Sequence, residues 1–568
     1  MRARRLDPAR PYKPLDFGNG IVSGTVSPGG RILSLGIAHP RHGRVVLSDM
    51  EPFPDELRRD QAAVRRYRAR LADLRREGFG LAIAAAGGDA SLVDERWPLG
   101  IVRSAGGATV EVLTLAPSGR AGVLQRAWIT AGDVPVARPG RLTGEPLLAR
   151  AAYPQLTEGG PLPPVVPGTL GAAWCARAAG PDLIAPGERA EVLLAVALGP
   201  SDQAARDEAD RILGAAAEAL SGTDNAGPPV DGAAPSRRHG DVIVERALSY
   251  CLDCAASALG DGIVALMADH EILPLVWTRD AYYVARALLV LRPDDPRARN
   301  AIAGFLRWLF ERAERPGGWW PRSSLASGAV KDPQFQLDQQ LYPLLLALDA
   351  DRHRNEARRA LDRLLGRRGR LGLIATMETP ADDPLGLPYH FSSHVLLWHV
   401  LDRFGHPDAD RLRADTVSHF TRDGRFAYAV GEGDAARHYH DANDLPTVFA
   451  PGWRFCAVDD PVWRATIDFA WSAANEGYVS GALAGLGSVH TLHPWPLGDL
   501  QDLVVARLVG EARRADGAAS RLDAVATWDD LLPEAYDERT GAVASRHHFA
   551  WPNALRALLL SDPTRVVP

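Results

Sequence analysis

The sequence predicts two domains: an antiparallel β-sandwich over residues 1–200, and an (α/α)6 barrel, a ring of six helical hairpins, over residues 239–568. Three observations lead to this prediction. The chain has 568 residues, more than one hydrophobic core usually supports. Short apolar runs separated by turn signals fill the first 200 residues. Helical periodicity begins near His239 and continues almost to the end of the chain.

The N-terminal region has the pattern of strands joined by tight turns. Gly18-Asn-Gly20 and Pro28-Gly-Gly30 are turn signals between apolar runs. Half-buried strands are predicted at residues 31–37, 43–48, 108–115 and 189–198. Many short strands of this kind are typical of an antiparallel sandwich.

An insert at residues 55–77 departs from the strand pattern. Leu57, Val64 and Leu71 stand seven residues apart, which predicts a helix with one apolar stripe. Its arginines are more simply a solvated face than a nucleic-acid-binding face.

Residues 201–238 are expected to connect the two domains. Residues 202–221 are strongly helical, and residues 223–236 are rich in Gly, Pro and Ala, which indicates a loop. Beyond them, helices are predicted at residues 240–259, 279–291, 296–312, 335–349, 353–367, 390–404, 408–419, 461–474, 496–514, 516–530 and 550–560. Paired helices without a fixed-period repeat favour a ring over a solenoid. Loops at one end of such a ring can supply chemistry while the helices stay rigid.

Composition excludes several classes of partner. The net charge of -6 gives no attraction to nucleic acid or to an anionic membrane. We find no window of about 18 apolar residues, and no apolar segment follows the charged N-terminus. We therefore expect a soluble cytoplasmic protein.

The four cysteines fit a reducing compartment. Cys251 and Cys254 have the spacing of a redox pair or of half a zinc site. They lie in an apolar helical pattern with no second pair in reach, which favours buried thiols.

Aromatic residues stand beside charged ones at two places that suit a sugar. In Trp277-Thr-Arg-Asp280, the Trp face can stack on a sugar ring while Arg279 and Asp280 bond its hydroxyls. A structural ion pair at a helix start is the alternative. Trp320, in Gly318-Trp-Trp-Pro321, can form an aromatic wall.

Gln336 and Asp338 precede an apolar helix that contains Tyr342-Pro343. They are candidates for contacts with sugar hydroxyls. Ordinary helix capping is the alternative for this pair.

Two carboxylate groups suit acid and base catalysis. Asp382 and Asp383 lie between Pro380 and Pro384, so they cannot occupy a helix interior. Adjacent carboxylates repel, which raises the pKa of at least one, and an acid catalyst near neutral pH needs a raised pKa. The alternative is a solvated acidic turn. Glu534 follows a proline and is placed in a loop shortly before the last helix.

Two polar stretches complete the candidate site. Asp441 and Asn443 lie in Tyr439-His-Asp-Ala-Asn-Asp-Leu-Pro446, and His490 and Trp495 lie in the segment from Gly485 to Pro496. The histidines of these stretches lack the spacing of a metal site, so sugar binding or core packing is favoured over metal binding. We expect no metal and no other cofactor.

Taken together, these segments resemble glycoside hydrolase family 125, the metal-independent exo-α-mannosidases. The family's W-x-R-D resembles Trp277–Asp280, its K-Y-E-L-D-S-x-x-Y-P resembles Phe335–Pro343, and its R-P-S-D-D-A resembles Thr379–Pro384. Its M-D-D-A-N-x-P-S resembles His440–Thr447, and its G-I-G-S-P-H-T with a later W-P resembles Gly485–Thr491 and Trp495-Pro496. Its H-E-S and T-R-x-W-F-x-W-A-N resemble Pro533–Ala535 and Ser545–Asn553. The motifs keep the family's order over residues 277–553, which makes the resemblance specific.

The resemblance implies an (α/α)6 barrel and an inverting mechanism. Glu534 would be the base, and the acid would come from the Asp382–Asp383 pair, with Asp382 chosen by analogy with related barrels. The terminal sugar would contact Trp277, Arg279, Asp280, Asp338, Asp441, Asn443 and His490, with Trp551 and Asn553 closing the site. In an inverting enzyme the two carboxyl groups stand about 6.5–9.5 Å apart, which leaves room for a water.

The chain also departs from the family. Gln336, His440 and Pro533 stand where the family has Glu, Asp and His, respectively. The N-terminal β-domain is more similar to that of glucoamylase-type (α/α)6 enzymes. The resemblance therefore implies a hydrolase for α-linked mannosyl or glucosyl units of an oligosaccharide or glycoside. The sugar, the linkage, exo or endo action and the oligomeric state stay open.

Two other functions are weighed. An inverting sugar phosphorylase on the same fold would use phosphate in place of the water and its base, and the presence of Glu534 argues against it. A carbohydrate-binding barrel without catalysis would not need the pair formed by Asp382 and Glu534.

Overall fold

The computed structural model describes residues 3–57, 60–81, 88–103, 107–137, 144–151, 172–221 and 239–562. The chain divides into two compact units. The first, here called the β unit, comprises Met1–Ala9, Lys13–Leu275 and Leu325–Ala329. The second, the helical unit, comprises Arg10–Tyr12, Val276–Ser324 and Val330–Pro568. The Gly/Pro/Ala-rich loop predicted at residues 223–236 lies outside the described residues.

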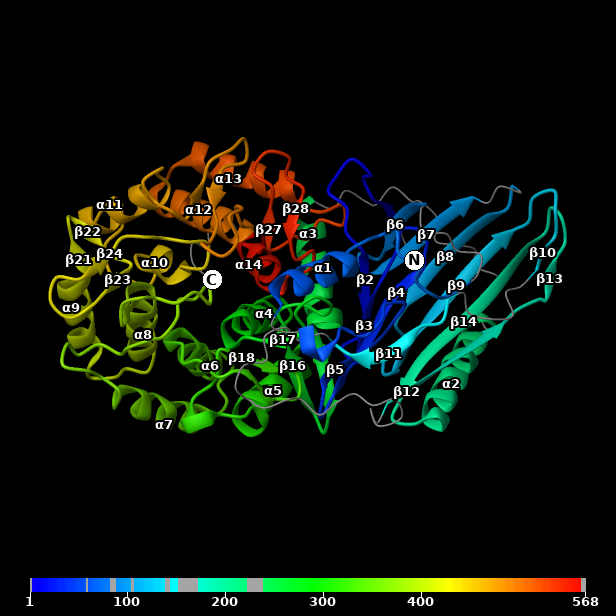
Figure 1. Ribbon diagram of the computed structural model, residues 1–568, viewed down its shortest axis with the longest axis horizontal. Coiled ribbons are helices and arrows are strands. Elements are labelled where there is room, and N and C mark those ends of the chain that lie inside the picture. Colours follow the sequence, from blue (N-terminus) through cyan, green and yellow to red (C-terminus); the bar gives the residue numbers. More distant parts are fainter. Residues whose placement is uncertain are drawn as a thin grey trace. The chain divides into compact units, whose positions relative to one another are not determined.

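The β unit contains two larger antiparallel sheets (Figure 1). The seven-stranded sheet has the order β1 (Ala3–Arg5), β6 (Asp89–Val93), β7 (Trp97–Arg103), β8 (Thr109–Leu115), β9 (Gly122–Thr130), β14 (Arg189–Gly199) and β12 (Ala173–Ala179). The five-stranded sheet has the order β11 (Leu147–Arg150), β5 (Gly43–Ser48), β4 (Ile32–His39), β3 (Val22–Val26) and β2 (Leu15–Gly18). A short pair is formed by β10 (Val136–Ala137) and β13 (Leu183–Ile184). Each of the four predicted strands is present, within one or two residues of its predicted bounds.

Two helices of the β unit correspond to predicted helical segments. Helix α1 (Gln61–Leu71) lies inside the predicted insert and begins after Asp60, whose carboxylate accepts hydrogen bonds from two backbone N–H groups of the first turn. Helix α2 (Asp202–Ser221) was expected to connect domains. Instead Ala209 and Ile212 pack against Leu124 and Leu193 of the seven-stranded sheet, so this helix is part of the core of the β unit.

Residues 239–275, which the sequence pattern assigns to the helical domain, group with the β unit. Helix α3 (His239–Tyr250) continues as a π-helical turn, Cys251–Ala255, and then the hairpin β15 (Ala256–Gly260) and β16 (Ile263–Leu266) replaces the predicted helix. The backbone explains the change: Gly20 donates to the carbonyl of Asp253 at 3.0 Å, and Ala258 donates to the carbonyl of Gly20 at 2.7 Å. Gly18 lies so close to this turn that an added Cβ would clash with the Asp253 carbonyl oxygen.

The buried thiols predicted at Cys251 and Cys254 are present, and all four cysteines of the chain are free. Burial raises the pKa of Cys251 to about 12, which is the environment of an inert structural thiol.

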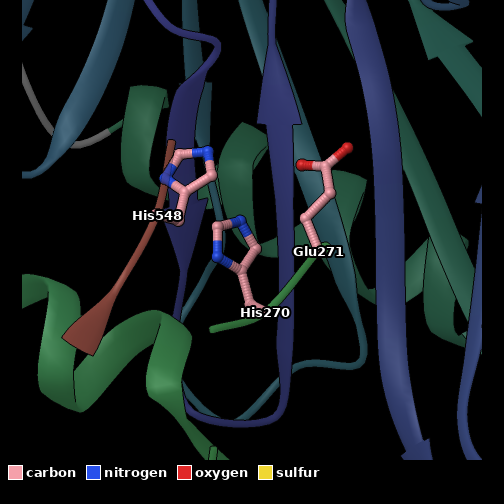
Figure 2. A group of neighbouring side chains, drawn as sticks. All are labelled: His270, Glu271 and His548. Atoms are coloured by element: carbon pink, nitrogen blue, oxygen red, sulfur yellow. The ribbon is translucent and has the colours of Figure 1, made fainter. Parts of the chain in front are cut away.

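A buried turn follows the β15–β16 hairpin. Asp269 holds it, because its Oδ1 accepts hydrogen bonds from the backbone N–H groups of Glu271, Ile272 and Leu273. Figure 2 shows that the side chains of His270 and Glu271 extend from this one turn. Burial lowers the pKa of His270 to about 4 and raises that of Glu271 to about 7. The Tyr250 hydroxyl lies 3.2 Å from Nδ1 of His270.

Six helices of the helical unit contact one another in a closed ring (Figure 1). In ring order they are α4 (Thr278–Leu291), α6 (Leu337–Asp349), α8 (Phe391–Arg403), α10 (Leu445–Phe449), α12 (Pro496–Val509) and α14 (Ala550–Ser561), and α14 contacts α4. These ring helices are buried along most of their length, as expected of helices that are apolar on several faces. The five-residue α10 was not predicted, because it is too short for a periodic pattern.

More amphipathic helices alternate with the ring helices along the chain. They are α5 (Pro296–Arg307), α7 (Arg354–Leu365), α9 (Ala409–Phe420), α11 (Pro461–Ala470) and α13 (Ala512–Val525). Helices α5, α7, α9 and α13 each pack against the preceding ring helix in the sequence. Helix α7 buries Ala357, Leu361 and Leu364 and turns its arginines outward.

Short strands occur in the loops of this unit, where the sequence had shown almost no strand signal. They are β17 (Leu275–Val276), β18 (Ser323–Leu325), β19 (Val330–Asp332), β20 (Tyr389–His390), β21 (Thr421–Arg422), β22 (Arg425–Phe426), β23 (Ala429–Val430), β24 (Ala436–Arg437), β25 (Tyr478–Val479), β26 (Gly485–Leu486), β27 (Ala535–Tyr536) and β28 (Val543–Ser545). The first and second of these cross the boundary between the units.

Three of the six ring helices begin directly after candidate site residues. Trp277 precedes α4, Gln336 precedes α6 and Trp495 precedes α12, each in an extended conformation. The N-terminal end of each of these helices therefore brings a candidate side chain together with the positive end of the helix dipole. Among the helices that the structure describes, none is long and apolar enough to cross a membrane.

Candidate active site at the start of the ring helices

Asp382 lies among donors from two ring helices. The Trp277 indole N–H donates to its Oδ2 at 2.9 Å, and the Gln336 amide donates to its Oδ1 at 2.8 Å. The Arg279 guanidinium stands 3.6 Å from the same Oδ1. The Asp382 side chain nevertheless keeps 27% of its surface exposed, so a substrate can reach it.

The backbone of the Asp382 loop is closed on itself. The Thr379 N–H donates to the carbonyl of Asp383 at 2.8 Å, and the Asp382 N–H donates to the carbonyl of Thr379 at 3.0 Å. Asp382 adopts a left-handed φ of 66°, a conformation that Asp tolerates better than most residues and that is often found at functional sites. This turn aims the two consecutive carboxylates at different partners.

Asp383 is paired with His490. Nδ1 of His490 lies 3.1 Å from Oδ2 and 3.2 Å from Oδ1 of Asp383. Burial on its own lowers the pKa of His490, but the bond to Asp383 and the charges of Asp383, Glu534 and Asp382 outweigh it, so the pKa is raised. Trp495 meets the His490 ring edge to face, with centroids 5.8 Å apart.

Glu534 is held at both carboxylate oxygens. The Arg546 guanidinium donates to Oε1 at 2.7 Å and the Ser545 hydroxyl donates to Oε2 at 2.7 Å. The Glu534 N–H also donates to the carbonyl of Arg546 at 3.0 Å, beside the hairpin of β27 and β28. The side chain is 10% exposed, which suits a carboxylate that acts on one bound water.

Asp280 interacts electrostatically with both candidate catalytic carboxyls. Burial first, and then the charges of Asp382 and Glu534, raise the pKa of Asp280 to about 7, against the opposing charges of Arg279 and Arg546. Asp280 is 4% exposed. The Asp382 and Glu534 loops, 152 residues apart in the chain, therefore act on the same buried group.

Arg279 links this acidic group to the ring. It donates to Oδ2 of Asp338 at 2.9 Å and lies over the Trp551 ring at 5.3 Å from the centroid. Burial on its own lowers the pKa of Arg279. The charges of Asp338, Asp280 and Asp382 raise it by more than burial lowers it, so the guanidinium stays charged.

Several buried polar atoms around these residues lack a hydrogen-bond partner within the described ranges. They are Oδ1 of Asp338, Oε1 of Gln336, Oδ1 of Asn443 and the indole nitrogens of Trp495 and Trp551, whereas Oδ1 of Asp280 and Nε of Arg279 form an ion pair with each other at 3.4 Å. Buried polar atoms are normally paired, so such a set is what a hydroxylated ligand or ordered water would satisfy.

Asp441 and Asn443 share one buried turn. The Tyr428 hydroxyl donates to Oδ2 of Asp441 at 3.2 Å, and the Asn443 N–H donates to Oδ1 at 2.7 Å. Burial, followed by the charge of Asp444, raises the pKa of Asp441 well above its ordinary value.

Two residues predicted to contact the sugar instead form their hydrogen bonds with the protein backbone. Trp320 is 2% exposed, packs edge-on against Phe310 and donates its indole N–H to the carbonyl of Leu309 at 3.1 Å. Asn553 accepts from the Leu532 N–H at 2.8 Å and donates to the carbonyls of Leu532 and Phe549 at 2.9 and 2.7 Å. Trp320 is thus a core residue, and Asn553 ties the Glu534 loop to α14.

The histidines of the polar stretches belong to separate networks. Nε2 of His440 lies 2.8 Å from Oε1 of Gln501, His490 faces Asp383, and Nδ1 of His493 lies 2.9 Å from Oε2 of Glu538. His493, Glu538 and Asp537 are close enough to hold a cation, but they stand at the surface, where such groups are common without one.

Sequence reasoning missed Arg546 and Glu378. Arg546 stands in the quoted segment from Ser545 to Asn553, and a cation next to a candidate base is a signal that was available. Glu378 directly precedes the Asp382 loop, but no local pattern shows that it faces Gln336, at 3.2 Å.

Part of this chain matches the model of a known protein family. Residues 412–560 match the model of a family described as metal-independent alpha-mannosidase (GH125). Curated proteins give no match.

Three solved structures are among those similar to this chain. A metal-independent α-mannosidase from Streptococcus pneumoniae, in a non-productive complex with α-1,6-mannobiose, is 19% identical, covers 56% of this chain and 93% of its own, and has a TM-score of 0.48. A bacterial glucoamylase complexed with acarbose is 12% identical, covers 99% of this chain and 95% of its own, and has a TM-score of 0.56. The glucoamylase from Saccharomycopsis fibuligera is 12% identical, covers 57% and 94% of the two chains, and has a TM-score of 0.40.

The family match at residues 412–560 supports a glycoside hydrolase, and the likeness to the bacterial glucoamylase is one of fold. The same match confirms the resemblance to the metal-independent α-mannosidases that the ordered motifs indicate. The alignment of nearly the whole chain with the bacterial glucoamylase confirms the likeness to glucoamylase-type structures.

Proposed function

We propose that this protein cleaves α-linked mannosyl or glucosyl units from oligosaccharides or glycosides by single displacement, with inversion at the anomeric carbon. The observation that carries the proposal is the pair of loop carboxyls: Asp382 is held by Trp277 and Gln336, and Glu534 is held by Arg546 and Ser545. The charges of both raise the pKa of the buried Asp280. The α-linkage and mannose are supported by the family match, and glucose by the fold shared with an acarbose-bound glucoamylase.

The proposal includes the architecture. We infer that the closed ring from α4 to α14 is the inner layer of an (α/α)6 barrel, with the alternating helices as its outer layer. We also infer that the seven-stranded and five-stranded sheets of the β unit form a β-sandwich, since each is antiparallel and has buried residues along its strands.

In the proposed mechanism, protonated Asp382 donates its proton to the glycosidic oxygen as the C–O bond breaks. Glu534 takes a proton from a water that attacks the anomeric carbon from the opposite face. In inverting glycosidases the two carboxyl groups stand about 6.5–9.5 Å apart, which leaves room for the attacking water. Trp277 and Gln336 fix the orientation of Asp382, and Arg546 and Ser545 fix that of Glu534. Asp383 is the alternative acid.

The terminal sugar would take up the unpaired polar atoms around these carboxyls. Arg279, Asp280 and Asp338 offer charge-assisted bonds to hydroxyl groups. Asn443 and His490 supply further polar contacts, and Trp277 and Trp495 present aromatic rings. The ring of Trp551 is 1% exposed and stacks on Tyr283, so Trp551 offers the sugar only its indole N–H. All proton transfer is assigned to side chains, so the proposal needs no cofactor. A cytoplasmic location is part of the proposal and is supported by the four free thiols.

The decisive experiment follows the released sugar by proton NMR. The wild-type protein is incubated with a panel of α-linked mannosides and glucosides, and the anomer formed first is recorded. We expect the β-anomer, and we expect Glu534→Gln to lower the rate by about 10²–10⁴-fold. The matched control is Glu538→Gln, which removes a nearby rim carboxylate and should leave the rate unchanged.

Three other results of this experiment would contradict the proposed function. Release of the α-anomer would contradict inversion. Turnover that requires inorganic phosphate would establish the phosphorylase, and binding of an oligosaccharide without any turnover would establish a carbohydrate-binding barrel.

A further inference from the structure

Glu378 lies across one side-chain amide from the proposed acid. Nε2 of Gln336 donates to Oδ1 of Asp382 at 2.8 Å and stands 3.2 Å from Oε2 of Glu378. Backbone pairing between Glu378 and Pro384 closes the base of the same loop. The two carboxyl groups are therefore fixed relative to each other by the backbone as well as by the amide.

The hydrogens of Gln336 are too few for the acceptors around it. Its amide nitrogen also lies 3.1 Å from the carbonyl oxygen of Thr379, so three acceptors compete for two hydrogens. The amide oxygen, Oε1, is buried without a partner within the described ranges. One of the three acceptors therefore receives no hydrogen from this amide, and a proton on either carboxyl group relieves the shortage.

The surroundings of Glu378 carry opposite charges on its two sides. Its Oε1 accepts from Arg322 at 2.9 Å, and Arg322 also stands 3.1 Å from Asp332, which is paired with Lys331 at 2.7 Å. On the other side stands Asp382, with Arg279 beyond it. The Glu378 side chain is 11% exposed. Burial, and next the charge of Asp382, raise the pKa of Glu378 to about 7, against Arg322 and the Gln336 bond.

We propose that Glu378 is a positioning residue for the acid: through the Gln336 amide it orients the Asp382 carboxyl, and the two carboxyl groups beside that amide share one proton, because they repel each other when both are ionised. This inference rests on the proposed function. Glu378 does not touch the substrate in this account. It acts because ionising Asp382 next to an ionised Glu378 places two like charges on one amide.

The test is the pH profile of kcat/KM for Glu378→Gln, a change that keeps the shape and removes the charge. In an inverting glycosidase, the alkaline limb of this profile reports the acid of the free enzyme. We expect that limb to move to lower pH by about one unit, because the neutral amide no longer opposes ionisation of Asp382. Glu378→Asp, which keeps the charge, should return the limb to the wild-type position even where kcat stays reduced.

A matched control uses an exposed carboxylate. Glu432 is paired only loosely with Arg370, at 3.8 Å, and Glu432→Gln should leave both rate and profile unchanged. A Glu378→Gln profile that falls equally at every pH, with the limb unmoved, would show a merely structural role and overturn the inference. If Glu378→Gln does not fold, Arg322→Gln replaces it. Loss of that cation should move the alkaline limb to higher pH. An unmoved limb in this variant would also contradict the inference.

Two different results would overturn the proposed function and the role of Glu378. A wild-type protein without activity on the whole panel overturns the proposed function. If the wild type is active but the alkaline limb of the kcat/KM profile stays in place in Glu378→Gln, only the inference about Glu378 is overturned.

Discussion

The Trp277 indole N–H donates a hydrogen bond of 2.9 Å to Oδ2 of Asp382. The two residues are 105 positions apart in the chain. The bond fixes an exposed loop carboxyl to the start of a buried ring helix, so the orientation of the proposed acid is set by a rigid element.

We predict that Trp277→Phe lowers kcat more than it changes KM. Phenylalanine keeps an aromatic face for the sugar but cannot donate to Asp382, so the carboxyl loses one of its two bonded donors. The expected loss in kcat is about tenfold, the worth of one hydrogen bond to a charged group. Steady-state kinetics on the best substrate of the panel checks this. A rise in KM with an unchanged kcat would mean that Trp277 serves binding only.

Replacing each member of the aspartate pair should identify the acid. We expect Asp382→Asn to lower kcat/KM by about 10²–10⁴-fold. The loss should be smaller on substrates whose leaving group needs little protonation. Asp383→Asn, the matched control, should cost less, because Asp383 faces His490. If Asp383→Asn is instead the more damaging change, the acid is Asp383.

Asn553→Ala should destabilise the fold as well as the site. Its side chain makes three hydrogen bonds: two with the backbone of Leu532 and one with the backbone of Phe549. Leu532 stands two residues before Glu534. Loss of three buried bonds, at roughly 1 kcal/mol each, gives about 3 kcal/mol of lost unfolding free energy. Urea denaturation measures it, and Asn553→Asp, which keeps an acceptor and loses the donor, should fall between. Full stability together with weaker substrate binding would instead support the sugar contact predicted from the sequence.

The Asp383–His490 pair should make loop stability depend on pH. The pKa of His490 is raised in the folded protein, so its contribution is fully present below the unfolded pKa of about 6.5 and is lost as pH rises through the folded pKa. The ring is partly exposed, so the coupling should stay below about 1 kcal/mol. A double-mutant cycle of Asp383→Asn and His490→Gln, run by unfolding at pH 5.5 and 8.5, should give coupling only at the lower pH. Equal coupling at both values would contradict the prediction.

Local patterns predicted the elements of the helical unit well. The helices α4, α6 and α8 begin within two residues of their predicted starts, because apolar periodicity and helix starts are properties of neighbouring residues. The same patterns failed where a distant segment competed for the backbone. The helix predicted to residue 259 ends at Ala255, since Gly20 pairs with both sides of that turn.

Residue chemistry likewise predicted the candidate site only in part. Asp382, Gln336, Arg279 and Trp277 were all singled out, and the structure brings them into contact. Trp320 was singled out by the same reasoning and lies in the core. A tryptophan has the same local signature in a core and at a sugar site, because only the surrounding elements decide which atoms remain uncovered.

The sequence by itself determined the order of strands and helices, the carboxylates available for catalysis and the motifs that the family match confirms at residues 412–560. The tertiary structure alone decided that Asp382 faces Gln336 and Glu378 while its neighbour Asp383 faces His490. The physical reason is the left-handed turn at Asp382, which is held in place by bonds within the loop and to ring helices far away in the chain. Periodicity records which face of an element is buried, but a partner across the ring depends on how the whole ring closes.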